Sequence, residues 1–176
     1  MTELWDVLDS FGNSLGKTCL RGTVLSSGEY HLVTEIVVTN GRGKLLLMYR
    51  HPDKSFGNCW EITGGSAVTG EDSRTAAQRE LKEETGISVP KKDLTFIRRL
   101  RGNGSALYDL YHVVRNLPKE KLAFQEEETT DALWVTKTEY LTLREEGKIC
   151  PPCADRLSEY ILSLLSSESR EGGTLL

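Results

Sequence analysis

Apolar residues along the chain occur in short runs broken by polar turns, which predicts a fold built largely from β-strands. The apolar and β-favouring stretches 3–8 and 15–20 flank the polar segment 9–14, and this arrangement predicts an N-terminal β-hairpin. Runs rich in Val, Ile, Leu and Thr predict further strands at 30–39, 44–50, 60–63, 94–100, 106–114 and 131–135.

Three segments carry the composition and end signals of helices. The first lies between a candidate N-cap, Asp72 or Ser73, and Gly86, which can take the left-handed conformation that ends a helix. A second helix is predicted at 138–146, with Thr138 as its cap.

The last helix is predicted to begin at Pro151 and Pro152. It carries one apolar stripe that we expect to pack in the core, formed by Leu157, Tyr160, Ile161, Leu164 and Leu165. Strands interleaved with two or three helices predict an α/β or α+β sandwich around a mixed β-sheet.

Length and composition fit one globular domain. The chain has 176 residues, 38% of them hydrophobic, which is enough for a single core. We expect this domain at 1–165 and a flexible tail at 166–176, where Ser, Glu, Gly and Arg dominate. The net charge of −4 argues against a partner that is a nucleic-acid polymer, since sequence-independent binding needs a basic stripe.

Targeting signals and a disulfide framework are both missing from the sequence. The N-terminus lacks a basic region followed by an apolar run, and no 18 apolar residues occur together, so we predict a cytoplasmic protein without a membrane segment. Four cysteines are too few and too scattered for a disulfide framework. Cys150 and Cys153 form a CxxC without a second ligand pair, and we interpret them as incidental thiols rather than a zinc or redox site.

The first predicted helix carries three carboxylates on one face. At about 100° per residue, Glu80, Glu83 and Glu84 fall within one narrow sector. Like charges at this spacing each cost roughly 0.2 to 0.5 kcal/mol, so the face requires positive charge nearby. Arg79 supplies one cation, and Mg²⁺ or Mn²⁺, which prefer oxygen ligands, would supply another. The pattern therefore predicts a divalent-metal site.

The spacing of residues 65–87 resembles the Nudix box at all nine of its defined positions. A chance match at one start position has odds on the order of one in a billion. The matching positions are Gly65, Glu71, Arg79, Glu80, the aliphatic Leu81, Glu83, Glu84, Gly86 and the aliphatic Ile87.

This resemblance to the Nudix hydrolase superfamily implies an α/β/α sandwich and Mg²⁺- or Mn²⁺-dependent cleavage of a small-molecule nucleoside diphosphate derivative. By position, Glu80, Glu83 and Glu84 resemble the metal-binding carboxylates, and the carbonyl of Gly64 would complete the coordination. Arg79 resembles the arginine that orients them, and Glu71 the outer glutamate of the box. A homodimer is compatible with the sequence.

Two roles outside metal binding are assigned to candidates only. The general base is either Glu83 or a glutamate of the downstream run at 126–128, of which Glu127 is the central residue. Arg50, at a predicted strand end, Lys54, in the next loop, and Arg21 are candidates for binding the substrate's phosphates.

Outside the box, the chain also resembles the Nudix subgroup that contains the type I isopentenyl-diphosphate isomerases. Arg50 and Lys54 keep that family's spacing of diphosphate-binding residues, His31 matches one of its metal histidines, and Asp109 falls near its catalytic glutamate. The isomerase requires a cysteine where this chain has Gly64, and we therefore predict a hydrolase.

Two alternatives stand beside the hydrolase. One is a 1,3-allylic isomerase of the isopentenyl-diphosphate type. The other is a non-catalytic Nudix module that binds a nucleotide diphosphate, although such a module would be expected to have lost helix carboxylates that are all present here. The identity of the diphosphate substrate is not encoded in any motif.

Overall fold

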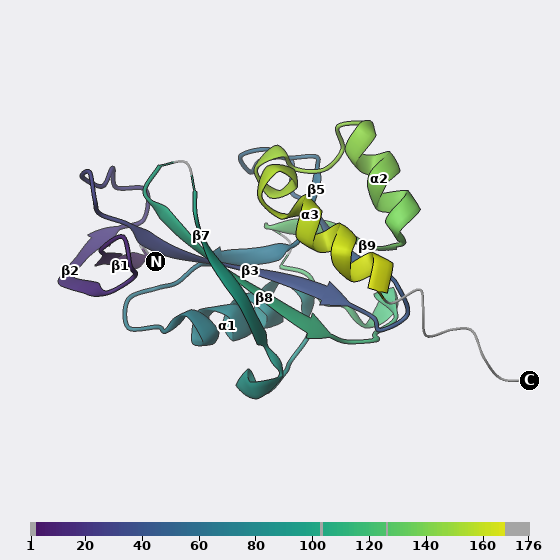
Figure 1. Ribbon diagram of the computed structural model, residues 1–176, viewed down its shortest axis with the longest axis horizontal. Helices are drawn as coiled ribbons and strands as arrows, with labels where there is room; N and C mark the ends of the chain where they lie inside the picture. The colour runs from purple at the N-terminus through teal and green to yellow at the C-terminus, as the bar shows by residue number, and fades with distance from the viewer. Residues whose placement is uncertain (1–2, 103, 126, 168–176) are drawn as a thin grey trace, which may run out of the picture. The chain divides into compact units, whose positions relative to one another are not determined.

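The computed structural model describes residues 3–102, 104–125 and 127–167. These residues form nine β-strands, three α-helices and two short 3₁₀ helices (Figure 1). The strands are β1 (Leu4–Leu8), β2 (Ser14–Leu20), β3 (His31–Thr39), β4 (Leu45–Arg50), β5 (Trp60–Glu61), β6 (Thr63–Ser66), β7 (Thr95–Arg101), β8 (Ala106–Val114) and β9 (Thr129–Val135). The helices are α1 (Ser73–Thr85), α2 (Lys137–Glu145), α3 (Pro151–Ser167), η1 (Lys91–Asp93) and η2 (Lys119–Lys121).

The strands form two sheets. β1 and β2 pair antiparallel by themselves, which confirms the predicted N-terminal hairpin. The others form a seven-stranded sheet in the order β5-β4-β3-β8-β7, with β6 paired to β3 and β9 paired to β4. The predicted class, helices combined with a mixed sheet, is confirmed.

The chain is divided into two compact units, and each is made of three segments. The first contains the chain up to Ile36, Gly64–Lys82 and Ser88–His112. The second contains Val37–Thr63, Glu83–Ile87 and the chain from Val113 onward. The single domain at 1–165 stays a prediction.

In the first unit, the hairpin fastens the loop that leads into α1. The N–H of Thr69 donates to the carbonyl of Leu4 at 2.8 Å, and the N–H of Gly70 donates to a carboxylate oxygen of Asp6 at 2.9 Å. Beside these contacts lies an apolar cluster of buried residues that excludes water from the same hairpin and from the start of α1. Its members are Leu8, Leu32, Ala67, Ala76 and Leu107, with Tyr30 packed against them.

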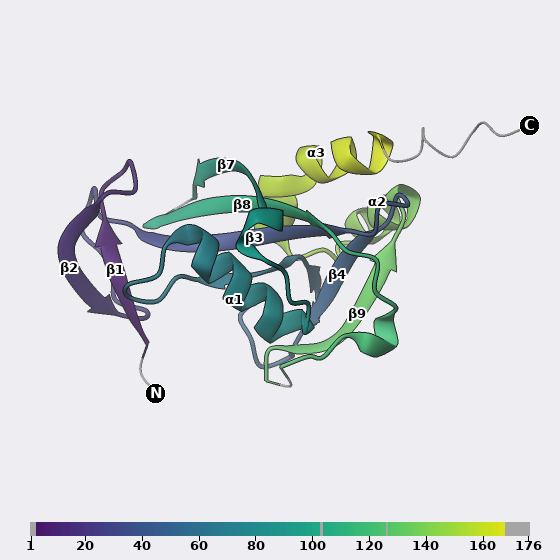
Figure 2. The ribbon, with the colours of Figure 1, turned by 90° about the horizontal axis from the view of Figure 1, so that it is seen from below.

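In the second unit, β4 and β9 run side by side as an antiparallel pair from Leu45 opposite Val135 to Arg50 opposite Thr129 (Figure 2). Buried Tyr140 of α2 contacts Ser158 of α3 through their hydroxyl groups, 3.1 Å apart. The predicted apolar stripe of α3 is confirmed as core packing at its three fully buried positions, Leu157, Ile161 and Leu165.

Two predicted boundaries differ from the structure. The strand predicted at 60–63 is two strands, because the chain changes partner at Ile62: β5 pairs with β4, whereas β6 pairs with β3. α3 continues through Ser167, so the predicted tail begins no earlier than residue 168, and 168–176 lie outside the described residues. In the described part of the chain, no helix has both the length and the apolar character needed to cross a bilayer.

The prediction that Thr138 caps α2 is wrong. Thr136 is the N-cap, and its hydroxyl accepts a hydrogen bond from the N–H of Glu139 while the Glu139 carboxylate accepts from the N–H of Thr136 at 2.7 Å. This reciprocal capping box satisfies two backbone donors that the first helical turn would otherwise leave without partners.

We predict that Thr136→Ala lowers the free energy of unfolding by about 1 kcal/mol, because it removes one partner of the capping box. Thr138→Ala is the matched control, since it makes the same change two residues later, and it should alter stability by less than about 0.5 kcal/mol. Urea denaturation measures both changes, and a larger loss in Thr138→Ala than in Thr136→Ala would contradict the assignment.

Candidate active site

The loop and helix at residues 64–87 begin and end on identifiable signals. The Asp72 carboxylate accepts hydrogen bonds from the N–H and the hydroxyl of Thr75, both at 2.7 Å, so Asp72 rather than Ser73 caps α1. Gly86 has a φ of 73°, the left-handed conformation predicted for the end of this helix. α1 is one uninterrupted helix, and its periodicity therefore puts residues three and four apart on one side.

The Arg79 guanidinium is the centre of a hydrogen-bond network in the first unit. Its Nε and Nη2 donate to the two carboxylate oxygens of Glu71 at 2.8 and 2.9 Å. Nη1 donates to Glu80 Oε1 at 2.8 Å, and Nη2 also donates to the carbonyl of Ser66 at 3.1 Å. One planar cation thus fixes two carboxylates and the backbone of the loop, which a lysine could not do with a single ammonium group.

Gly65 lies close to the Glu80 carboxylate, and its backbone is not in the left-handed conformation. A Cβ at this position would lie 2.5 Å from the carboxyl carbon of Glu80, well inside van der Waals contact. The preceding Gly64 is equally confined, because a Cβ there would lie 2.2 Å from the carbonyl oxygen of Thr34. The two glycines therefore let the loop backbone pass directly against Glu80 and against β3.

The Glu71 carboxylate is mostly buried, and burial by itself would raise its pKa. The hydrogen bonds from Arg79 and from the N–H of Val68 outweigh burial, and they hold the pKa of Glu71 below its ordinary value of 4.5. Glu71 therefore stays ionised as the partner of Arg79 under all but acidic conditions.

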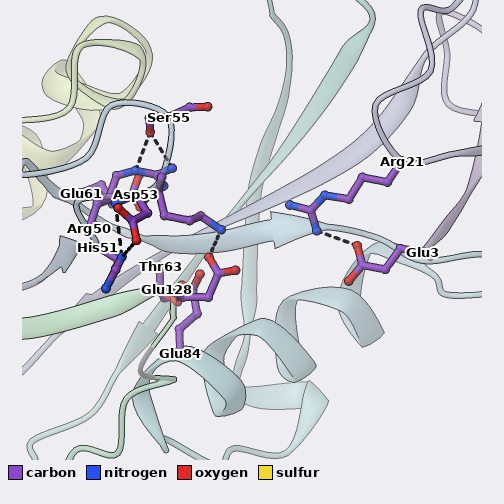
Figure 3. A network of polar contacts seen from close by, with 11 residues as sticks. Glu3, Arg21, Arg50, His51, Asp53, Ser55, Glu61, Thr63, Glu84 and Glu128 are labelled. Atoms are coloured by element: carbon purple, nitrogen blue, oxygen red, sulfur yellow. Dashed lines mark hydrogen bonds and ion pairs between the residues drawn. The ribbon is translucent and has the colours of Figure 1, made fainter. Parts of the chain in front are cut away.

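In the second unit, Glu84 and Glu83 differ in environment. The hydroxyl of buried Thr63 donates to the half-buried carboxylate of Glu84, as drawn in Figure 3, whereas the Glu83 side chain is exposed. Glu84 is thus held by the strand that delivers the chain to the glycine loop.

Arg50 and Lys54, the predicted phosphate-binding residues of the second unit, both have carboxylate partners. Arg50 pairs with Glu61, and its Nε and Nη2 donate to the carbonyl of Ser55 at 3.0 and 2.8 Å (Figure 3). Lys54 pairs with Glu128. Arg50 therefore organises the loop 51–58, and Lys54 ties this loop to the segment that precedes β9.

The remaining predicted residues of the first unit also have defined neighbours. Arg21 pairs with Glu3 at 2.6 Å (Figure 3). Buried Asp109 accepts two hydrogen bonds from Arg99, at 2.6 and 2.9 Å.

His31 stacks on Trp5 with ring centroids 3.9 Å apart. Burial, and to a lesser extent the charge of Arg21, lower the pKa of His31, so its ring is neutral at pH 7. Glu127 is exposed, whereas Glu126, another candidate of the same run, lies outside the described residues.

Comparison with known proteins gives the family. Residues 29–151 match the NUDIX domain. An uncharacterized Nudix hydrolase of Listeria monocytogenes is 37% identical over 153 residues, which cover 85% of this chain and 89% of that protein. A crystal structure of a Deinococcus radiodurans protein covers 96% of this chain and 100% of its own, with a TM-score of 0.67 at 21% identity. The chain belongs to the Nudix family.

As a Nudix hydrolase, the protein acts on pyrophosphate bonds, and the predicted enzyme class is confirmed. The isopentenyl-diphosphate isomerase of Saccharopolyspora erythraea is also similar, at 27% identity over 165 residues that cover 88% of this chain and 84% of that protein. That likeness is weaker than the one to the Listeria hydrolase. The confinement of Gly64 also disfavours isomerase chemistry, because a cysteine there would collide with the Thr34 carbonyl.

The donor chemistry of the Nudix helix fits a divalent cation. Nudix hydrolases generally use divalent metal ions, and the carboxylates of α1 are the hard oxygen ligands that such ions prefer. Among the described residues, no three His, Cys, Asp or Glu side chains already converge as a ligand set. Glu80 is instead held by Arg79, and Glu84 by Thr63.

Three polar residues near these groups were missed by sequence reasoning. Thr63 donates a hydrogen bond to Glu84, and Glu61 forms an ion pair with Arg50. No local sequence pattern predicts either contact. Glu35 is 93% buried on β3, next to the backbone against which Gly64 packs. The sequence did contain an indication of Glu35, because an ionisable residue within the apolar run of a central strand is unusual and often functional.

We predict that Glu71 makes stability depend on pH in the acid range. Because its folded-state pKa lies below that of the unfolded chain, the carboxylate stabilises the fold at neutral pH, and this contribution is lost as pH falls through the folded value. The stability difference between wild type and Glu71→Gln should therefore shrink as pH falls below 4.5.

Urea denaturation across that range measures the difference. Glu159→Gln, which changes an exposed carboxylate of α3 in the same way, is measured beside it as the matched control. A stability difference for Glu71→Gln that grows on acidification would contradict the lowered pKa.

Proposed function

We propose that this Nudix hydrolase uses Mg²⁺ or Mn²⁺ to cleave the diphosphate bond of a nucleoside diphosphate derivative or a nucleotide. The observation that carries the proposal is the Arg79 network, in which one guanidinium holds Glu71 in a bidentate pair and positions Glu80 on the helix of the Nudix box. A helix face that was only apolar, or only exposed to solvent, would not require an arginine that binds two carboxylates.

The residues proposed to hold the metal are Glu80, Glu83, Glu84 and the carbonyl of Gly64. Their spacing on α1 supports this assignment, because i, i+3 and i, i+4 carboxylates share one side of a helix. When bound, the ion neutralises charge on the phosphoryl oxygens and lowers the pKa of a water that can attack phosphorus.

Arg79 and Glu71 are positioning residues in this proposal. Arg79 keeps the Glu80 carboxylate oriented. Glu71 fixes the orientation of the guanidinium by accepting hydrogen bonds from two of its nitrogens. The depressed pKa of Glu71 supports the role, because the pair then persists throughout the neutral range.

Glu83 is the proposed general base, and Glu127 is the alternative. Glu83 is supported by its exposed side chain, which water can reach, whereas Glu80 and Glu84 are half-buried. Of the downstream carboxylates, Glu128 is neutralised by Lys54. A base must remain able to accept a proton from water, and an ion-paired carboxylate does so less readily.

Lys54, Arg50 and Arg21 are the proposed phosphate contacts. Each is paired with a carboxylate in the structure, and a phosphate oxygen can take the place of that carboxylate with similar geometry. Lys54 is the best supported of the three, because Arg50 also holds the loop 51–58 through the Ser55 carbonyl. Asp109 has no role in the proposal, since its carboxylate is paired with Arg99, and His31, which stacks on Trp5, is given none.

We predict that Glu83→Gln lowers kcat by at least about 10²-fold on whichever substrate the wild type cleaves, because the amide keeps the size of the side chain but cannot serve as an anionic ligand or proton acceptor. The assay is a panel of nucleotide sugars, dinucleotides, nucleoside triphosphates and isopentenyl diphosphate, each with Mg²⁺ and with Mn²⁺.

Glu159→Gln is the matched control and should keep wild-type kcat, since Glu159 is an exposed residue of α3 outside the Nudix box. Full activity of Glu83→Gln would remove Glu83 from the proposal. Conversion of isopentenyl diphosphate to its dimethylallyl isomer without phosphate release would replace the hydrolase by the isomerase.

A further inference from the structure

A cavity of about 530 Å³ lies in the second unit, and none of its lining residues belongs to the proposed active site. Three chain segments form it: the turn between β3 and β4, the segment after β8, and β9. Its volume falls within the range of small-molecule sites. The residues that matter for its chemistry are Asn40, Arg42, Lys44, Asn116, Leu117 and Trp134.

The turn that carries the two cations is fixed by its own hydrogen bonds. The side-chain oxygen of Asn40 accepts from the N–H of Arg42 at 2.8 Å and from the N–H of Lys44 at 3.1 Å. The N–H of Asn40 donates in turn to the carbonyl of Lys44 at 3.0 Å. Because its oxygen is used within the turn, Asn40 presents its amide N–H groups as donors.

Trp134 of β9 also lines this cavity, and its ring is fixed by a hydrogen bond. Its indole N–H donates to the carbonyl of Leu117 at 2.9 Å, which fixes the ring relative to the segment after β8. A ring fixed in this way offers a flat apolar surface with little conformational entropy to lose on binding.

The charge around the cavity favours an anion. Arg42 and Lys44 both carry positively charged side chains. The carboxylate of Glu139 lies near Lys44, but it accepts hydrogen bonds from the N–H and the hydroxyl of Thr136 at the cap of α2. A second carboxylate of the unit, Asp131, is paired with Lys119 at 2.5 Å. The lining therefore combines two cations, two amides and one aromatic ring.

We propose that this cavity is a second ligand site that binds a nucleoside monophosphate, with the phosphate at Arg42 and Lys44 and the base against Trp134. The cations suit a phosphate group, and the indole and the amides of Asn40 and Asn116 suit a flat heterocycle with polar edges. The site is separate from hydrolysis, since a nucleoside monophosphate contains no diphosphate bond.

The test is titration of the full chain with AMP in buffer without divalent metal, followed by the indole N–H signals in a ¹H–¹⁵N spectrum. Trp134→Phe assigns the Trp134 signal among those of the three tryptophans. The expected result is a saturable shift of the Trp134 signal by millimolar AMP. Absence of a shift would overturn the proposal.

The double variant Arg42→Ala/Lys44→Ala should bind AMP at least about tenfold more weakly, because both charged partners of the phosphate are removed. The matched control Lys92→Ala/Arg98→Ala removes one exposed lysine and one exposed arginine from the first unit and should bind AMP like wild type. Equal affinity of the two double variants would overturn the assignment of the phosphate.

Two fragments of the probe separate its parts. Adenosine and ribose 5-phosphate should each bind more weakly than AMP, since each lacks one of the recognised groups. Adenosine that binds as tightly as AMP would overturn the proposal. Arg42→Ala/Lys44→Ala should keep wild-type hydrolysis without AMP, so a failure here is distinguishable from a failure of the proposed active site.

Discussion

The bidentate pair between Arg79 and Glu71 is the interaction on which the proposed active site depends. It ties the middle of α1 to the loop that precedes the helix, and a further donor from the same guanidinium orients Glu80. Burial would push Glu71 toward its neutral form, and the charge-assisted hydrogen bonds prevail. Gly65 lies against the same carboxylate, and a Cβ at this position would require the Glu80 side chain to shift.

In the second unit, the proposed phosphate-binding side chains are held by ion pairs with residues elsewhere in the sequence. Lys54 and Glu128 are 74 positions apart, and they join a loop to the segment before β9. Arg50 serves both Glu61 and the Ser55 carbonyl. If these cations bind the substrate's phosphates, each exchanges a carboxylate partner for a phosphate. This exchange has a smaller desolvation free energy than binding by a cation that is fully hydrated in the free enzyme. The loop 51–58 then stays ordered through Arg50 while Lys54 changes partner.

Local signals in the sequence were sufficient for most of the fold and for the motif. The hairpin, the end of α1 at Gly86, its start at either Asp72 or Ser73, and the apolar stripe of α3 all follow from residues that are close together in the sequence. The structure decides between the two caps in favour of Asp72. The capping box of α2 was also local, since Glu139 three residues after Thr136 marks the cap, and Thr138 lacks that partner.

What could not be predicted depends on tertiary contacts. Asp109 is neutralised by Arg99 because the β7–β8 register places them opposite each other, and the split at Ile62 arises because consecutive strands find different partners. The ligand cavity beside Trp134 is made of three segments whose meeting no motif encodes.

The central claim is that Arg79 positions carboxylates for a divalent ion. Electron paramagnetic resonance of free Mn²⁺ measures the affinity of the protein for the ion directly, in wild type, in Arg79→Lys and in the same-helix control Arg74→Lys. The account predicts affinity at least about tenfold weaker in Arg79→Lys, because lysine keeps the charge but loses the bidentate geometry, and unchanged affinity in Arg74→Lys. Mn²⁺ bound as tightly by Arg79→Lys as by wild type would contradict it.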